Sequence, residues 1–193
     1  TIGDIGCFSF YPTKVMTTGE GGMLTTNNKK LYTKMNAYKN FGRGKNPNFI
    51  SFLGSNYKIS EFTAIMGILE LGRIKERINK RKAIVLRYLK NLRDNDKYEL
   101  IIQNKGRSSY YKCIIKTKIK SKIIHKYCKS RGIQLTGKVW DTPIHNQKVF
   151  KKYANKSNFK NSEKFSEYHI CPPNYPELTL DEIDYVCSVL NEI

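Results

Sequence analysis

The sequence contains no long hydrophobic run. No uninterrupted apolar stretch reaches the roughly 18 residues that a membrane-spanning helix needs. The start of the chain also lacks the basic segment, apolar core and small residues that mark a secretory signal peptide. We therefore expect no membrane partner and a cytoplasmic location.

Cysteine is present but is not arranged in pairs. The 5 cysteines are far apart, with no C-x-x-C pair and no metal-site spacing. They are Cys7, Cys113, Cys128, Cys171 and Cys187. This pattern indicates neither a disulfide framework nor a metal site, and it predicts free, largely buried thiols in a reducing compartment.

Two glycine-rich nucleotide-binding signatures are also missing. The sequence has no G-x-x-x-x-G-K-S/T motif and no G-x-G-x-x-G motif after a strand. By motif, the chain is neither a P-loop protein nor a dinucleotide-binding domain.

Acidic residues are scarce, because 16 Asp and Glu stand against 35 Lys and Arg, a net charge of +19. Such a charge is typical of nucleic-acid-binding proteins, in which Tyr110 and Tyr111 would be stacking platforms. The basic residues are mostly lysines spread along the chain, and at Lys116–Lys122 they alternate with other residues as on a solvated strand face. A basic nucleic-acid-binding module stays an alternative, but we expect no nucleic-acid partner.

The first half of the chain alternates between strand and helix patterns. Residues 4–10 and 23–26 read as short strands, and Asn28 is placed to cap a helix over about 29–40. A long apolar stripe predicts a helix from 60 to near 93, with Gly72 as the place where it would break.

A polar segment at 93–96 is the best domain boundary, and it divides the chain into 1–93 and 94–193. Beyond it we expect a strand over 110–117, a helix over about 121–131 and a final helix that starts with a capping box of Thr179 and Glu182. The alternation of strands and helices indicates an α/β fold.

The most specific pattern lies at the start of the chain. Residues 3–14, GDIGCFSFYPTK, form a strand pattern that ends in a lysine, and the glycine-rich segment TTGEGG follows at 17–22. A desolvated lysine amine can attack a carbonyl, and the Ser9 hydroxyl could bind a phosphate oxygen. Taken alone, however, Lys14 is one lysine among many, and a solvent-facing lysine is the ordinary interpretation.

Four segments, in the same order, resemble the DegT/DnrJ/EryC1/StrS aminotransferases. Residues 3–22 resemble the cofactor-lysine segment of that family, and residues 54–61, GSNYKISE, resemble its G-x-N-Y-R/K element. Residues 143–150 and 172–186 resemble the P-L/I-H segment and the final segment of its small domain.

The resemblance implies an α/β fold-type I pyridoxal-phosphate-dependent transferase. This chain would be a fragment of it, with the end of the large domain in 1–93 and the small C-terminal domain in 94–193. The first half of the family fold, with the Asp that pairs with the pyridine nitrogen, would precede Thr1. We therefore expect an N-terminally truncated piece whose activity alone is doubtful.

The resemblance also implies roles for single residues. Lys14 would bind pyridoxal 5′-phosphate covalently and act as the catalytic proton shuttle. Ser9 would bind the cofactor phosphate, and Asn56 would reach the cofactor phosphate of a neighbouring subunit. Lys58 and His145 are weaker candidates for substrate binding, and a structural role for His145 is an equal alternative.

The expected reaction transfers an amino group, with glutamate as the usual donor, to a nucleotide-linked keto-sugar. The full-length protein would be a homodimer. A dehydratase of the same family would replace the lysine, so Lys14 argues against it. A non-catalytic or regulatory homologue of the same fold stays open.

Overall fold

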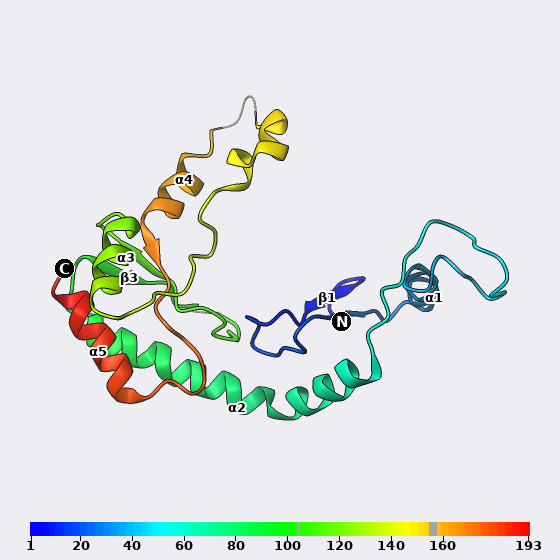
Figure 1. The fold of residues 1–193 in the computed structure, drawn as a ribbon, viewed down its shortest axis with the longest axis horizontal. Coiled ribbons are helices and arrows are strands. Elements are labelled where there is room, and N and C mark those ends of the chain that lie inside the picture. The colour runs from blue at the N-terminus through cyan, green and yellow to red at the C-terminus, as the bar shows by residue number, and fades with distance from the viewer. Residues whose placement is uncertain (104, 155–157) are drawn as a thin grey trace. The chain divides into compact units, whose positions relative to one another are not determined.

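The computed structural model describes residues 1–103, 105–154 and 158–193 (Figure 1). The chain divides into two compact units, Thr1–Lys75 and Glu76–Ile193. The division falls inside helix α2 (Glu61–Leu92). Across the described ranges, no helix combines the length and the apolar character needed to cross a bilayer.

The first unit contains a two-stranded antiparallel hairpin. Strand β1 (Gly6–Ser9) pairs with β2 (Gly22–Thr25) along their full lengths. These strands agree with the predicted segments 4–10 and 23–26 in place but are shorter, since residues 10–21 form the loop that connects them.

Two helices follow the hairpin. Helix α1 (Lys29–Tyr38) begins after Asn28, whose side chain accepts hydrogen bonds from two backbone N–H groups of the first turn. This confirms the predicted cap. Helix α2 confirms the predicted long helix, but it is continuous through Gly72, so the expected break there is wrong. A single glycine costs a helix only about 1 kcal/mol, which the flanking turns outweigh.

The second unit packs helices against a three-stranded antiparallel sheet in the order β3-β4-β5. The strands are β3 (Tyr98–Leu100), β4 (Ile115–Thr117) and β5 (His169–Ile170). The remaining helical segments are α3 (Ser121–Ser130), η1 (Ile144–Asn146), η2 (Lys148–Tyr153), α4 (Lys160–Glu167) and α5 (Leu180–Asn191). The core joins Tyr88 and Leu92 of α2 to apolar side chains of the sheet, α3 and α5.

The predicted strand over 110–117 is wrong in extent. Only Ile115–Thr117 pairs as a strand, and Tyr110 has a left-handed backbone with φ 51°. The alternation at Lys116–Lys122 therefore covers the end of β4 and the start of α3 rather than one strand face. The predicted capping box at Thr179 and Glu182 is present at the start of α5.

All 5 cysteines are free thiols, as predicted. Cys7 is exposed, and the other four are buried in the second unit. Burial raises the pKa of the Cys128 and Cys187 thiols to about 11, so these side chains behave as small apolar core residues.

Candidate active-site loop and aromatic pocket

The loop between β1 and β2 carries Lys14. Its side chain is half-buried, and its backbone N–H donates a hydrogen bond to Tyr11 O at 2.9 Å. Ser9 ends β1 with an exposed side chain, and its Oγ accepts the Tyr11 N–H at 3.4 Å. The structure thus places the two predicted cofactor residues on either side of one tight turn.

Two threonines that the sequence analysis did not single out close this loop. Thr17 Oγ1 donates to Phe10 O at 3.0 Å, and the Thr18 backbone N–H donates to the same oxygen at 3.0 Å. Thr18 Oγ1 also donates to Glu20 O at 2.9 Å. Phe10 and Thr18 are both buried, so the two ends of the segment that carries Lys14 are held together by these hydrogen bonds. The signal was the T-T pair directly before the glycines.

The glycines at 19, 21 and 22 are required by the path of the backbone. Gly19 has φ 78° and Gly21 has φ 153°, which side chains rarely tolerate. A Cβ at Gly21 would lie 2.7 Å from Thr18 Oγ1, and one at Gly22 would lie 2.9 Å from Phe8 O. The turn therefore accepts glycine alone at these positions, as the family segment has it.

Helix α2 supports the same loop through Gly67. A Cβ added there would lie 3.4 Å from Thr18 Cγ2 and 3.7 Å from Met16 Cε. A side chain as small as alanine at this helical position would therefore lie at ordinary van der Waals distance from the loop. Helix α2 thus passes close to the loop at a residue more than fifty positions after Lys14 in the chain.

Asn56 and Lys58 lie together elsewhere in the first unit, next to the end of α1. Asn56 pairs with Asn40 in an antiparallel bridge, and Lys58 Nζ donates to Asn40 Oδ1 at 3.1 Å. Lys58 Nζ also lies 5.8 Å from the ring centroid of Phe41. Both side chains are exposed. Their shared neighbour is Asn40, and both are presented to solvent, where a ligand or another chain can reach them.

His145 belongs to the second unit, where it lies in the wall of a pocket of about 660 Å³. Its ring stacks on Phe159 with centroids 4.3 Å apart, and its Nε2 is 3.2 Å from Glu163 Oε1. The side chain is only 13% exposed. The structural role and the substrate-binding role of His145 therefore both stay open. Its ring packs against Phe159 and Glu163, and it also borders a cavity.

The donor groups on the β1–β2 loop fit a phosphorylated aldehyde cofactor. Lys14 supplies a primary amine, which can bond covalently to an aldehyde carbon, and Ser9 supplies a hydroxyl for a phosphate oxygen. The side-chain-free turn at Gly19–Gly22 lets a ligand approach the backbone closely.

Comparison with known sequences gives one family over nearly the whole chain. The model of the DegT/DnrJ/EryC1/StrS aminotransferase family matches residues 1–191. A dTDP-4-amino-4,6-dideoxy-D-glucose transaminase of Shigella dysenteriae is 27% identical over 99% of this chain and 53% of its own length. A GDP-perosamine synthase of Escherichia coli O157:H7 is 28% identical over 100% of this chain and 52% of its own length. The chain thus spans about half the length of the curated relatives it matches.

Solved structures give the same fold. An aminotransferase of this family from Brucella abortus superposes with a TM-score of 0.90 at 22% identity, over 98% of this chain and 51% of that one. A Helicobacter pylori aminotransferase involved in the biosynthesis of pseudoaminic acid superposes with a TM-score of 0.86 at 24% identity. The match covers 98% of this chain and 53% of that one. The predicted fold class, part of an α/β fold-type I transferase, is confirmed.

Proposed function

Because this chain belongs to the DegT/DnrJ/EryC1/StrS aminotransferase family, we propose that it forms the lysine-bearing half of a pyridoxal-phosphate-dependent aminotransferase. The observation that carries the proposal is the β1–β2 loop, in which Ser9, Lys14 and the glycine turn keep the order of the family segment. Since the chain spans about half of its relatives, the activity is proposed for the protein in which the other half of the fold joins it.

Each residue of the loop has one task in this proposal. Pyridoxal phosphate, when bound, supplies an electron sink for the charge left on the donor's α-carbon. Lys14 Nζ would hold the cofactor through its aldehyde carbon and, when free, would carry the proton between the donor's α-carbon and C4′. Ser9 Oγ would donate a hydrogen bond to the cofactor phosphate. The hydrogen-bonded base formed by Thr17 and Thr18 keeps Lys14 in one position.

The substrate class follows from the relatives. The relatives are named for dTDP-, GDP- and UDP-linked amino-sugars. We propose that the acceptor is a nucleotide-linked keto-sugar and that glutamate is the amino donor. Asn56 would bind the cofactor phosphate of a partner subunit in a homodimer, and Lys58 and His145 would contact substrate. Both Asn56 and Lys58 are exposed, as residues that meet another chain must be before it binds.

The domain assignment also stays part of the proposal. Residues 1–93 would complete the large cofactor-binding domain, and 94–193 would form the small domain, in a cytoplasmic enzyme. The polar segment at 93–96 supports this boundary because it directly follows α2 and precedes β3. Helix α2 lies wholly within 1–93, although its part from Glu76 onward belongs to the second compact unit.

The test is chemical mapping of the cofactor. The full-length protein is loaded with pyridoxal phosphate, reduced with borohydride and digested, and the peptides are analysed by mass spectrometry. We expect phosphopyridoxyl on Lys14 and on no other lysine. Modification of a different lysine, or of none, contradicts the assignment, and the second result would favour a non-catalytic homologue.

A further inference from the structure

Residues 136–141 form an irregular strap that hydrogen bonds tie to the end of α4 and to the segment after β5. At the first residue of the strap, Thr136 forms an antiparallel bridge with Cys171, and Thr136 Oγ1 donates to Cys171 O at 2.7 Å. At its last residue, Asp141 O accepts a hydrogen bond from Ser166 Oγ at 2.7 Å. The strap is thus held at both ends, and its middle meets β5.

A single imidazole ties the middle of the strap. His169 is fully buried, and its Nε2 accepts the Val139 backbone N–H at 3.0 Å. Its Nδ1 lies against Phe165 O. A backbone N–H can only donate and a carbonyl oxygen can only accept, so Nε2 carries no proton and Nδ1 carries one. The strap in this position therefore requires the neutral ring.

The packing of the ring leaves no second way to make these hydrogen bonds. The imidazole stacks on Phe165 with ring centroids 4.3 Å apart and planes inclined by 9°. A proton on His169 Nε2 would face the Val139 N–H. Two donors that face each other inside a protein lose their hydrogen bond and leave two unsatisfied groups. Protonation of this ring therefore removes the tie to the strap.

The surroundings of His169 favour its neutral form. Burial is the largest cause that lowers the pKa of His169, and the Phe165 carbonyl opposes it. Lys138 and Lys112 lower this pKa further, and Asp141 raises it. The elements packed around the ring also carry other titratable groups: Lys116 of β4, His125 and Cys128 of α3, and Glu167 of α4. A proton reaches the ring most readily when the strap has moved away and water replaces it.

The thiol of Cys171 lies beneath the strap. It is a free cysteine with no exposed surface. Burial raises the pKa of this thiol, and Lys112 and the Val139 backbone N–H oppose the rise. The same backbone N–H thus acts on the Cys171 thiol and on the His169 ring, so movement of Val139 changes the surroundings of both.

We propose that His169 is a proton-operated latch, which holds the strap over Cys171 when neutral and releases it when protonated. Release uncovers the thiol and moves Val139 and Trp140, which line the aromatic pocket. The strap is closed at neutral pH and opens as pH falls. The latch does not depend on the proposed function, because it uses neither Lys14 nor the cofactor.

Proton linkage sets the size of the effect. An imidazole that resists the proton in the closed strap, and titrates near its ordinary pKa of about 6.5 in the open strap, is about 90% protonated in the open state at about pH 5.5. The equilibrium constant for opening then rises about tenfold between about pH 7.5 and about pH 5.5. Closure is fully present above about pH 6.5 and is lost as pH falls, which is the sign that a lowered pKa requires.

Trapping of thiols measures the opening of the strap. The chain is pulsed with a dipyridyl disulfide, which reacts with thiols in acid as well as at neutral pH, and each modified peptide is quantified by mass spectrometry. The exposed Cys7 is the reference for intrinsic reactivity. Three other buried thiols report unfolding of the core: Cys113, Cys128 and Cys187. We expect labelling of Cys171 relative to Cys7 to rise about tenfold from about pH 7.5 to about pH 5.5, while the core thiols stay protected.

The sequence has 3 histidines, so single substitutions test every imidazole. His169→Gln keeps a neutral acceptor for the Val139 N–H but does not titrate, and labelling of Cys171 is expected to lose its acid rise. His125→Gln and His145→Gln are the matched controls and should keep that rise. His125 is the sharper control, because Lys138 and Asp141 also act on its pKa. Circular dichroism at each pH checks that every variant is folded.

A fourth variant keeps the test decisive where His169→Gln does not fold. Thr136→Val removes the tie from Thr136 Oγ1 to Cys171 O but leaves the latch intact. It should raise labelling of Cys171 at every pH and keep the same tenfold ratio between about pH 5.5 and about pH 7.5. Loss of the ratio in this variant would assign closure to Thr136 and overturn the latch.

The remaining outcomes are equally distinct. Labelling of Cys171 that does not change with pH overturns the latch, and so does an acid rise that persists in His169→Gln. Labelling of Cys128 and Cys187 together with Cys171 shows that the core as a whole has opened, which also contradicts a local latch. Each of these results is independent of whether Lys14 carries the cofactor.

Discussion

Lys14 is the residue whose charge and chemistry can be separated by one substitution. Lys14→Arg keeps the positive charge on the β1–β2 loop, but a guanidinium is never deprotonated in a protein and does not attack an aldehyde. We expect no borohydride-fixed cofactor and a rate of amino transfer lower by about 10²–10⁴-fold or more. Absorbance of the loaded protein and single-turnover kinetics measure the two effects.

The matched control for that substitution is Lys45→Arg, in the exposed loop after α1. It should leave cofactor loading and rate unchanged. A Lys14→Arg protein that still traps the cofactor covalently would show that another amine carries it, and the assignment of the loop would then be wrong.

The buried His169 ring is expected to make the free energy of unfolding depend on pH. Its Nε2 accepts the Val139 N–H, and its Nδ1 lies against Phe165 O, so the folded state holds the neutral ring. Burial lowers the pKa of His169, Lys138 and Lys112 lower it further, and the Phe165 carbonyl and Asp141 oppose them. Burial likewise lowers the pKa of His125.

The sign of the effect on stability follows from the lowered pKa. Below about pH 6.5 the unfolded chain takes up protons that the folded chain resists, so the free energy of unfolding falls as pH falls. Stability from this source is fully present above that pH. We expect chemical denaturation to show a smaller loss between about pH 7.5 and about pH 5.5 in His169→Gln than in the unaltered chain. An equal loss in both proteins would contradict the role of His169.

At the scale of elements, Gly42 sets the path of the chain after α1. It has φ 75°, and a Cβ there would lie 1.7 Å from Phe52 O. Gly42→Ala therefore demands both a strained backbone and a displaced carbonyl, and we expect it to destabilise the first unit by about 2–4 kcal/mol. Gly72→Ala is the control, because its Cβ meets nothing within 4 Å and lies in helix α2.

The control substitution should move stability in the opposite direction. Alanine in an open helical position stabilises by up to about 1 kcal/mol over glycine. Thermal midpoints of the two variants, followed by far-UV circular dichroism, measure the contrast. A Gly42→Ala midpoint equal to that of the unaltered chain would mean that the segment 40–56 has another path.

Elements defined by local chemistry were predictable from the sequence. The cap at Asn28, the capping box at Thr179 and the long helix each depend on residues within a few positions of one another. The short strands β3 and β5 were not predicted, because they exist only through pairing with β4. The loop of Lys14 was recognisable as one motif, whereas the aromatic pocket combines the segment 143–150 with residues outside it, such as Trp140, Tyr153 and Phe165.

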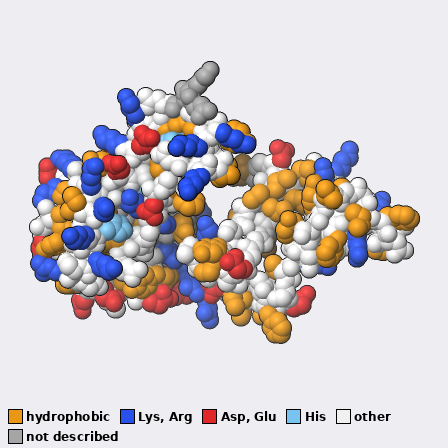
Figure 2. Space-filling model, turned by 45° about the horizontal axis from the view of Figure 1, so that its top comes forward, with side chains coloured by type: hydrophobic (Ala, Val, Ile, Leu, Met, Phe, Trp, Pro, Cys, Tyr) orange, Lys and Arg blue, Asp and Glu red, His pale blue; other side chains and the backbone are white. Residues whose placement is uncertain are grey.

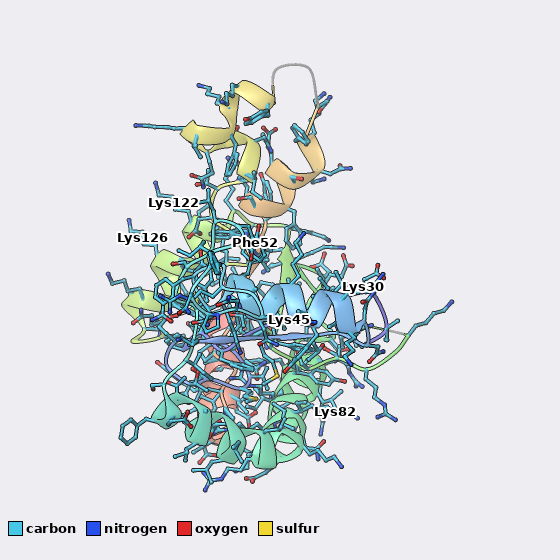
Figure 3. All side chains as sticks on the ribbon, turned by 90° about the vertical axis from the view of Figure 1, so that its right-hand side faces the viewer. Lys30, Lys45, Phe52, Lys82, Lys122 and Lys126 are labelled. Atoms are coloured by element: carbon cyan, nitrogen blue, oxygen red, sulfur yellow. The ribbon has the colours of Figure 1, made fainter. Side chains whose placement is uncertain are left out.

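The basic character of the whole molecule is distributed rather than gathered. In Figure 2, Lys and Arg side chains lie dispersed over the visible face of the second unit, with acidic side chains between them. Lys122 and Lys126 extend from α3 into solvent (Figure 3). These features suit a solvated surface, and the charge of +19 then acts chiefly by repelling other copies of the chain.

Opposing that repulsion is an apolar surface on the first unit. Hydrophobic side chains gather on the face of this unit seen in Figure 2. On the first half of α2, the exposed ones are Phe62, Ile65, Met66, Ile68, Leu69 and Leu71, with Phe62 at 85% and Ile68 at 71%. An apolar stretch of this kind marks a surface that another protein surface covers.

The salt dependence of association distinguishes an apolar interface on α2 from a basic nucleic-acid-binding surface. Screening weakens the repulsion between chains of charge +19 but leaves apolar attraction intact, so we expect the average mass of the chain in sedimentation to rise with salt. Phe62→Asp should suppress this association, whereas Ile123→Asp, on α3 of the second unit and 57% exposed as isoleucine, should leave it unchanged. A nucleic-acid-binding module makes the opposite prediction, because its complexes dissociate as salt rises. Association that falls with salt and is insensitive to Phe62→Asp would therefore contradict an apolar interface on α2. It would favour the nucleic-acid-binding interpretation of the positive charge.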